Sequence, residues 1–193
     1  MNLSALSSTQ IGIAIAVVVV IVAACIGIWF SIRKRRTEKL RTQFGSAEYT
    51  RAVNEGGSQR KAEAALDKRA ERVEALHIRP LAPADRARFV DSWTRVQARF
   101  VDSPGGAVTD ADQLLGDVMS TRGYPMSDFE QRAADISVDH PLVLDNYRAA
   151  HQAALRQTRG QASTEDLRQA MIHYRTLFEE LVAGPEIARA QGA

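Results

Sequence analysis

The chain has 193 residues, with 25 Lys and Arg, 23 Asp and Glu and a single Cys. This length fits one domain with an appendage, and a single Cys excludes both a disulfide framework and a Cys-rich zinc site. Twelve Gly and six Pro exclude a collagen-like or Pro-rich low-complexity chain. The composition indicates a folded domain and specifies no reaction.

Positive charge is concentrated in one short segment. The first 32 residues carry no charged side chain, and six of the nine residues from Arg33 to Arg41 are basic. The other 19 basic and 22 acidic residues lie in residues 42–193, which are therefore net negative. A nucleic-acid-binding domain normally spreads positive charge over one face of its fold. The charge distribution thus argues against nucleic acid as a partner.

Residues 11–30 form an uncharged run, IGIAIAVVVVIVAACIGIWF, in which only Gly12 and Gly27 fall outside the apolar set. As a helix, about 20 residues span the ~30 Å hydrocarbon core of a bilayer, with every backbone polar group bonded internally. The run therefore predicts a single transmembrane helix, preceded by a short extracytoplasmic N-terminus at residues 1–10.

The C-terminal flank of this run predicts its orientation. Aromatic side chains favour the membrane interface, and basic residues favour the cytoplasmic side. Basic residues near the surface also attract anionic lipid headgroups, at about 1 kcal/mol each. We expect a bacterial inner-membrane protein with its N-terminus outside, a basic juxtamembrane segment at residues 31–42 and a cytoplasmic C-terminal domain. The predicted interface residues are Trp29, Phe30, Arg33, Lys34, Arg35 and Arg36.

Alternative interpretations of the apolar run fit less well. A cleaved signal peptide has a basic start and a shorter apolar core than this run. Residues 22–25, ending in Cys25, resemble a lipoprotein cleavage site, but the apolar run continues beyond them and RKRR follows. A buried helix of a soluble protein is rarely apolar over twenty uninterrupted residues. Pairs of small residues such as Gly12 and Ala16 are only a weak indication of helix association.

Residues 43–78 predict a charged helical stalk. The stretch 58–76 is rich in Ala, Glu, Lys and Arg, and its apolar face is thin. Gly45 and the Gly56-Gly57 pair predict breaks in the helix. A helix of this kind suits an exposed spacer that follows the membrane segment.

Residues 79–184 predict an amphipathic helical domain, followed by a frayed tail at residues 185–193. The strongest apolar stripe is Phe89, Trp93, Val96 and Phe100, at helical spacing. Residues 103–106, SPGG, predict a turn rather than the start of the next helix. That next helix is expected to end at Gly123, where Gly suits a C-cap.

Three further helices are expected from their capping residues. Ser127 predicts the N-cap of a short helix, with Glu130 as its capping-box partner. Asp139 predicts the N-cap of a helix that ends at Gly160, and Ser163 predicts the N-cap of the last helix. The predicted fold class is therefore all-α: a single N-terminal transmembrane helix followed by a soluble helical bundle or array.

No catalytic or cofactor motif is present in the sequence. It contains no P-loop, dinucleotide-binding fingerprint, HExxH or GxSxG. We therefore expect no cofactor, no metal and no enzyme activity. The alternative hypothesis is a membrane-anchored enzyme or small-ligand-binding domain with a pocket near Tyr124, His140 and His151. Trp93 is a further candidate for a partner or ligand groove, although its spacing also suits a helix core.

The pieces RPL, WTRVQARFVD, DADQLL, RGYP and SVDHP, which fall between Arg79 and Pro141, resemble a group of uncharacterised bacterial membrane and secreted proteins. The resemblance covers about a third of the chain. It implies a bacterial origin and a membrane location, and it brings no activity or site residue.

Two functional hypotheses follow from an anchor without catalytic signatures. The first is a tethered adaptor or regulatory module, because tethering raises the effective concentration of the domain near other membrane components. Its partner would be an unidentified protein. The second is a structural protein of the envelope, with residues 58–76 as a spacer.

Overall fold

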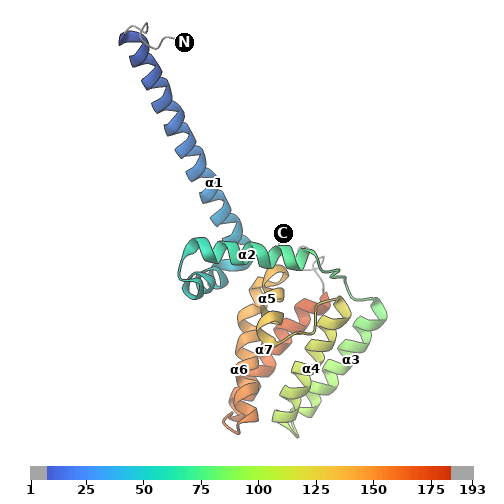
Figure 1. The fold of residues 1–193 in the computed structure, drawn as a ribbon. Helices are drawn as coiled ribbons and strands as arrows, with labels where there is room; N and C mark the ends of the chain where they lie inside the picture. Colours follow the sequence, from blue (N-terminus) through green and yellow to red (C-terminus); the bar gives the residue numbers. More distant parts are fainter. Residues whose placement is uncertain (1–7, 184–193) are drawn as a thin grey trace. The chain divides into compact units, whose positions relative to one another are not determined.

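The computed structural model describes residues 8–183, which contain seven α-helices, one short 3-10 helix and no strand (Figure 1). The all-α prediction is confirmed. In chain order the elements are α1 (Ser8–Gly56), α2 (Gln59–Glu74), α3 (Pro83–Arg99), α4 (Pro104–Arg122), α5 (Phe129–Asp139), η2 (Pro141–Val143), α6 (Leu144–Thr158) and α7 (Thr164–Ala183).

The chain divides into two compact units, residues 1–43 and residues 44–193. Within the first unit, α1 holds a stretch long and apolar enough to cross a membrane, and none of its most apolar window is buried. The large side chains there are more than half exposed, as for Val20 at 67% and Ile28 at 60%. Length and composition thus agree with the predicted transmembrane helix.

Gly45 interrupts α1 just inside the second unit. Its backbone is left-handed in φ (75°) and extended in ψ (160°), a conformation that favours Gly. Phe44 and Tyr49, on either side of this break, are 1% and 3% exposed. A second break follows at Gly57, with φ 67°, where α1 gives way to α2. Both predicted breaks are confirmed.

Helix α2 is packed against α5, which differs from the exposed stalk expected for residues 58–76. Leu66 is fully buried, and Ala62 and Val73 are 1% and 4% exposed. The apolar face of α2 is thin in sequence, yet it suffices because most of its members are small and allow close approach. Ser58 caps α2 by accepting a hydrogen bond from the amide of Lys61.

The main core lies among α3, α4, α5, α6 and α7, with α7 packed against both α4 and α6 (Figure 1). The stripe predicted around Trp93 faces this core. Trp93 is 6% exposed and stacks on Phe178 of α7, with ring centroids 4.8 Å apart. Burial of two such rings contributes a large apolar area and an additional stacking term.

Helix α4 begins at Pro104, so the turn predicted at residues 103–106 is wrong. Pro suits the first helical turn because its missing N–H has no intrahelical partner there. Gly106 lies inside the helix, where its missing side chain leaves room for Arg99: a Cβ there would lie 2.9 Å from Nη2 of Arg99. The far end of α4 follows the prediction, because Gly123 adopts the left-handed conformation at its C-cap.

Two other caps differ from those predicted. The N-cap of α5 is Asp128, not Ser127, and its Oδ1 accepts a hydrogen bond from the amide of Gln131 at 2.9 Å. Asp139 ends α5 instead of opening the next helix, and His140 is the C-cap. Pro141 then starts the 3-10 turn η2 that leads into α6. Asp and Ser are comparable N-caps, so the sequence pattern alone does not distinguish between these neighbours.

Candidate functional site

The predicted membrane-interface residues lie on the exposed surface of α1. The rings of Trp29 and Phe30 meet edge to face, with centroids 5.2 Å apart. The guanidinium carbon of Arg33 lies 5.3 Å from the centroid of the Trp29 ring. Lys34, Arg35 and the other basic residues follow directly. An aromatic pair next to a basic collar matches the side-chain preferences of a membrane–water interface.

Tyr124 and His140, two of the three predicted pocket residues, share a buried polar cluster at one end of the bundle. Arg122, at the last turn of α4, is 2% exposed and lies 3.2 Å, Nη1 to Nε2, from the His140 ring. The other ring nitrogen, Nδ1, lies 2.9 Å from Oε1 of Glu180 on α7. Arg122 also donates to the carbonyl of Leu181 at 3.1 Å.

The partners of His140 fix the tautomer of its neutral ring. A guanidinium only donates, so Nε2 accepts from Arg122 and Nδ1–H donates to Glu180. Both ring nitrogens are therefore engaged, and His140 is 3% exposed. A general base needs a nitrogen within reach of a substrate proton. In this arrangement the imidazole ties α4 and the end of α5 to α7.

Tyr124 completes this cluster. Its hydroxyl donates to Oδ2 of Asp139 at 2.8 Å, so the segments RGYP and SVDHP meet in space. Burial and the neighbouring Asp139 charge raise the pKa of Tyr124 well above its usual range. The phenol is thus a neutral donor at any physiological pH, which suits a structural bond.

His151 lies apart from this cluster, in the middle of α6. It stacks on Phe129 with ring centroids 3.6 Å apart and a 5° interplanar angle. Within residues 8–183 its buried Nδ1 has no hydrogen-bond partner, and burial lowers the pKa of the ring. The single helix predicted from Asp139 to Gly160 is divided in the structure, because α5 ends at Asp139 with His140 as its C-cap, whereas His151 belongs to α6.

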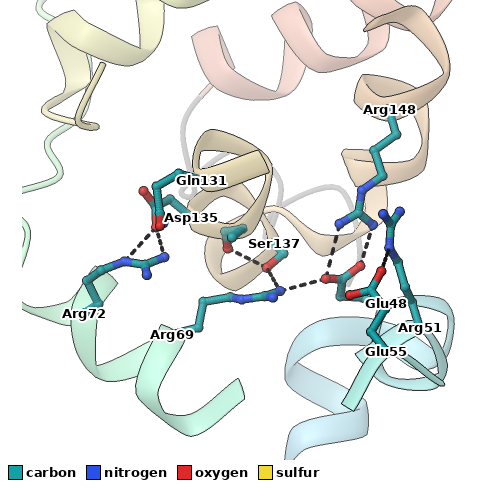
Figure 2. Close-up of polar contacts among 10 residues, drawn as sticks. Glu48, Arg51, Glu55, Arg69, Arg72, Gln131, Asp135, Ser137 and Arg148 are labelled. Atoms are coloured by element: carbon teal, nitrogen blue, oxygen red, sulfur yellow. Dashed lines mark hydrogen bonds and ion pairs between the residues drawn. The ribbon is translucent and has the colours of Figure 1, made fainter. Parts of the chain in front are cut away.

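Glu48 is the centre of a second polar cluster, which no sequence pattern indicated (Figure 2). Its carboxylate is 5% exposed, and it accepts from Arg69 of α2 at 2.7 Å and from Arg148 of α6 at 2.5 Å. Burial opposes ionisation of Glu48, but the hydrogen bonds and charges of Arg148 and Arg69 outweigh it and lower its pKa. One carboxylate thereby joins three helices.

Ser137 and Asp135 of α5 extend this cluster along α2 (Figure 2). Arg69 also donates to the Ser137 hydroxyl at 3.2 Å, and Arg72 forms an ion pair with Asp135. Asp135 is 1% exposed and also accepts from the side-chain amide of Gln131 at 3.0 Å. Arg72 and Asp135 are 63 residues apart in the chain, and Glu48 and Arg148 are 100 apart, so no local pattern marks these two pairs.

Across residues 8–183 no three His, Cys, Asp or Glu side chains come together as a metal site. A surface groove lies between α3 and α4, but Tyr124, His140 and His151 are not among the residues that line it. Trp93 is also absent from its lining, although its neighbours Ser92 and Val96 contribute.

The chain matches no family model, no curated protein sequence and no solved structure.

Proposed function

We propose that this chain is a single-pass protein of a bacterial inner membrane, whose helical domain acts in the cytoplasm as a tethered protein-interaction module. The exposed apolar stretch of α1 carries the proposal. Its side chains are covered by nothing in the described part of the chain, and a lipid environment would satisfy them.

The flanking charges support the orientation. Arg33, Lys34, Arg35 and Arg36 directly follow the apolar stretch and are exposed, so anionic headgroups on the cytoplasmic face would attract them. The domain that begins at residue 44 would then be held close to the inner leaflet. An N-terminus outside and a C-terminus inside follow from the same asymmetry.

The polar clusters of the domain favour binding over catalysis. Tyr124 and His140 are buried and bonded to neighbouring side chains, and Glu48 is enclosed between two guanidinium groups. These groups stabilise helix packing, which leaves the outer helical surface as the part available to a partner. No observation favours the pocket hypothesis for Tyr124, His140 and His151.

Two measurements test the membrane assignment. The full-length protein should stay with vesicles after an alkaline wash, whereas a variant that lacks residues 11–30 should be released. A reporter fused after Ala193 should be active as a fluorescent protein and inactive as alkaline phosphatase. Release of the intact chain, or active phosphatase, would contradict the proposal.

A third measurement tests the interaction role. In-cell crosslinking followed by capture of the tagged full-length chain should retain a specific protein in stoichiometric yield. The variant without residues 11–30 should retain less of it, because tethering raises the local concentration of the domain. If the full-length chain retains no specific protein, the module function is excluded.

A further inference from the structure

A groove of about 320 Å³ runs along the surface between α3 and α4. Val96 of α3 and Leu114 of α4 form its apolar floor, each 8% exposed. Ser92 and Gln113 lie along it, and the charged side chains of both helices form its walls. A groove between two helices with an apolar floor is a surface on which a partner helix can place an anchoring side chain.

The two walls carry opposite charge. Arg95 and Arg99 belong to α3, whereas Asp110 and Asp117 belong to α4. Arg99 and Asp110 form an ion pair that bridges the groove. Gly106 leaves room for this pair, since a Cβ there would lie 2.9 Å from Nη2 of Arg99.

The other two charged residues of the groove, Arg95 and Asp117, do not form an ion pair with each other. Arg95 donates to Ser92 of its own helix at 2.8 Å and forms no ion pair with an acid in residues 8–183. Within that range the Asp117 carboxylate forms no hydrogen bond or ion pair, and the hydroxyl of Thr121 donates to the Asp117 backbone carbonyl instead. The groove therefore offers one cation on one wall and one anion on the other.

We propose that this groove binds a helical segment of a partner protein that carries one aliphatic anchor flanked by an acidic and a basic residue. The acid would face Arg95, the base would face Asp117 and the anchor would lie on Val96 and Leu114. This inference rests on the proposed function as an interaction module and names its contact surface. Opposite charges on the two walls fix the orientation of the segment and reject segments with a single sign of charge.

Three labelled helical peptides test the proposal with the full-length chain in lipid nanodiscs. Each has a central Leu with charged residues three positions before and after it, which places them on opposite flanks of the helix. One peptide carries Glu and Lys, one carries two Glu and one carries two Lys. Fluorescence anisotropy should give the Glu/Lys peptide the lowest Kd, by about tenfold over each of the others.

A charge reversal then tests the groove itself. The Arg95→Glu variant has acidic groups on both walls, so the peptide with two Lys should become the tightest of the three. Arg168→Glu is the matched control: it makes the same change in net charge on the exposed face of α7, and the original order should persist. A photoreactive Leu in the peptide should crosslink within residues 92–99 and 110–117.

Any of three results would overturn the inference. The first is that the Glu/Lys peptide shows no measurable binding, and the second is that the photoreactive peptide crosslinks only outside residues 92–99 and 110–117. The third is that Arg95→Glu and Arg168→Glu rank the three peptides in the same order of affinity. These results leave the in-cell capture unaffected, so failure of the groove is distinguishable from failure of the module function. A partner that is captured equally by the wild-type chain and by Arg95→Glu would also place the contact surface elsewhere.

Discussion

At the scale of single residues, Glu48 attaches the segment after Gly45 to α2 and α6 through its ion pairs with Arg69 and Arg148. Its carboxylate is 5% exposed and bonds to two guanidinium groups whose side chains are 21% and 16% exposed. Removal of the acid would leave two cations facing each other in a largely dry site. Removal of one partner from a buried ion pair lowers the stability of the fold by more than the intact pair adds to it. The reason is that the remaining charges stay desolvated without a partner.

We predict that Glu48→Gln lowers the free energy of unfolding by about 2–3 kcal/mol at neutral pH, because the amide keeps the shape but not the charge. Denaturant unfolding of the full chain in mild detergent, followed by near-UV circular dichroism, measures it. Glu55→Gln is the control: its ion pair with Arg51 is exposed and spans one helical turn, so about 0.5 kcal/mol or less is expected. Equal effects of the two substitutions would refute the role of Glu48.

The same residue predicts a pH dependence. The pKa of Glu48 is lowered below its ordinary value of 4.5, so its contribution to stability is complete above pH 4.5 and is lost as the pH falls through the lowered pKa. The difference in stability between wild type and Glu48→Gln should therefore be constant near neutrality and shrink in acid below pH 4.5. Unfolding curves across this pH range measure it, and a difference that grows in acid would contradict the sign.

His140 links two helices to α7 through both nitrogens of its ring. We predict that His140→Ala costs about 1–3 kcal/mol, because Arg122 and Glu180 each lose a partner and Arg122 is buried. The exposed His77→Ala variant should change stability by about 0.5 kcal/mol or less. Thermal unfolding of the two variants compares them, and equal melting temperatures would show that the cluster contributes nothing.

At the scale of elements, α2 illustrates the limit of an amphipathic pattern. Its charged composition favours an exposed spacer, but the pattern does not report how close a neighbouring helix can approach. Leu66 is fully buried, and Arg69 and Arg72 bond to Ser137 and Asp135 of α5. Helix α2 is therefore part of the folded domain.

We predict that Leu66→Ala destabilises the domain by about 2–5 kcal/mol, the range found for buried leucines. Ala65→Ser, at an exposed position of the same helix, serves as the control. Its free energy of unfolding should stay within about 0.5 kcal/mol of the wild type. Denaturant midpoints of the full chain measure both. If Leu66→Ala has no more effect than the control, α2 behaves as a free spacer.

At the scale of the whole molecule, the apolar stretch of α1 sets the environment in which the domain works. We predict that Ile21→Arg, near the middle of residues 11–30, weakens membrane insertion, because a central Arg costs about 2.5–3.5 kcal/mol in a transmembrane helix. Ile21→Leu should insert like the wild type. The fraction that resists alkaline extraction measures both variants, and equal resistance would argue that this segment does not cross the bilayer.

Local patterns predicted the helical class, the breaks at Gly45 and Gly57 and the cap at Gly123, because backbone conformation depends on neighbouring residues. The helix at Pro104 and the cap at Asp128 were missed, because at each place the neighbouring residues offered two comparable local solutions. In the same way the sequence indicated Tyr124 and His140 as candidate site residues. It did not indicate that Arg122, Asp139 and Glu180 are their partners.

The sequence by itself determined where the chain is apolar, where it is basic and where its helices form, since each of these depends on side chains within a few turns. Tertiary structure alone decided the partners of the buried charges. Glu48 meets Arg148 across 100 residues of chain, and Asp135 meets Arg72 across 63. Such pairs form because helix packing removes water from groups that must then satisfy one another, and no local pattern encodes that packing.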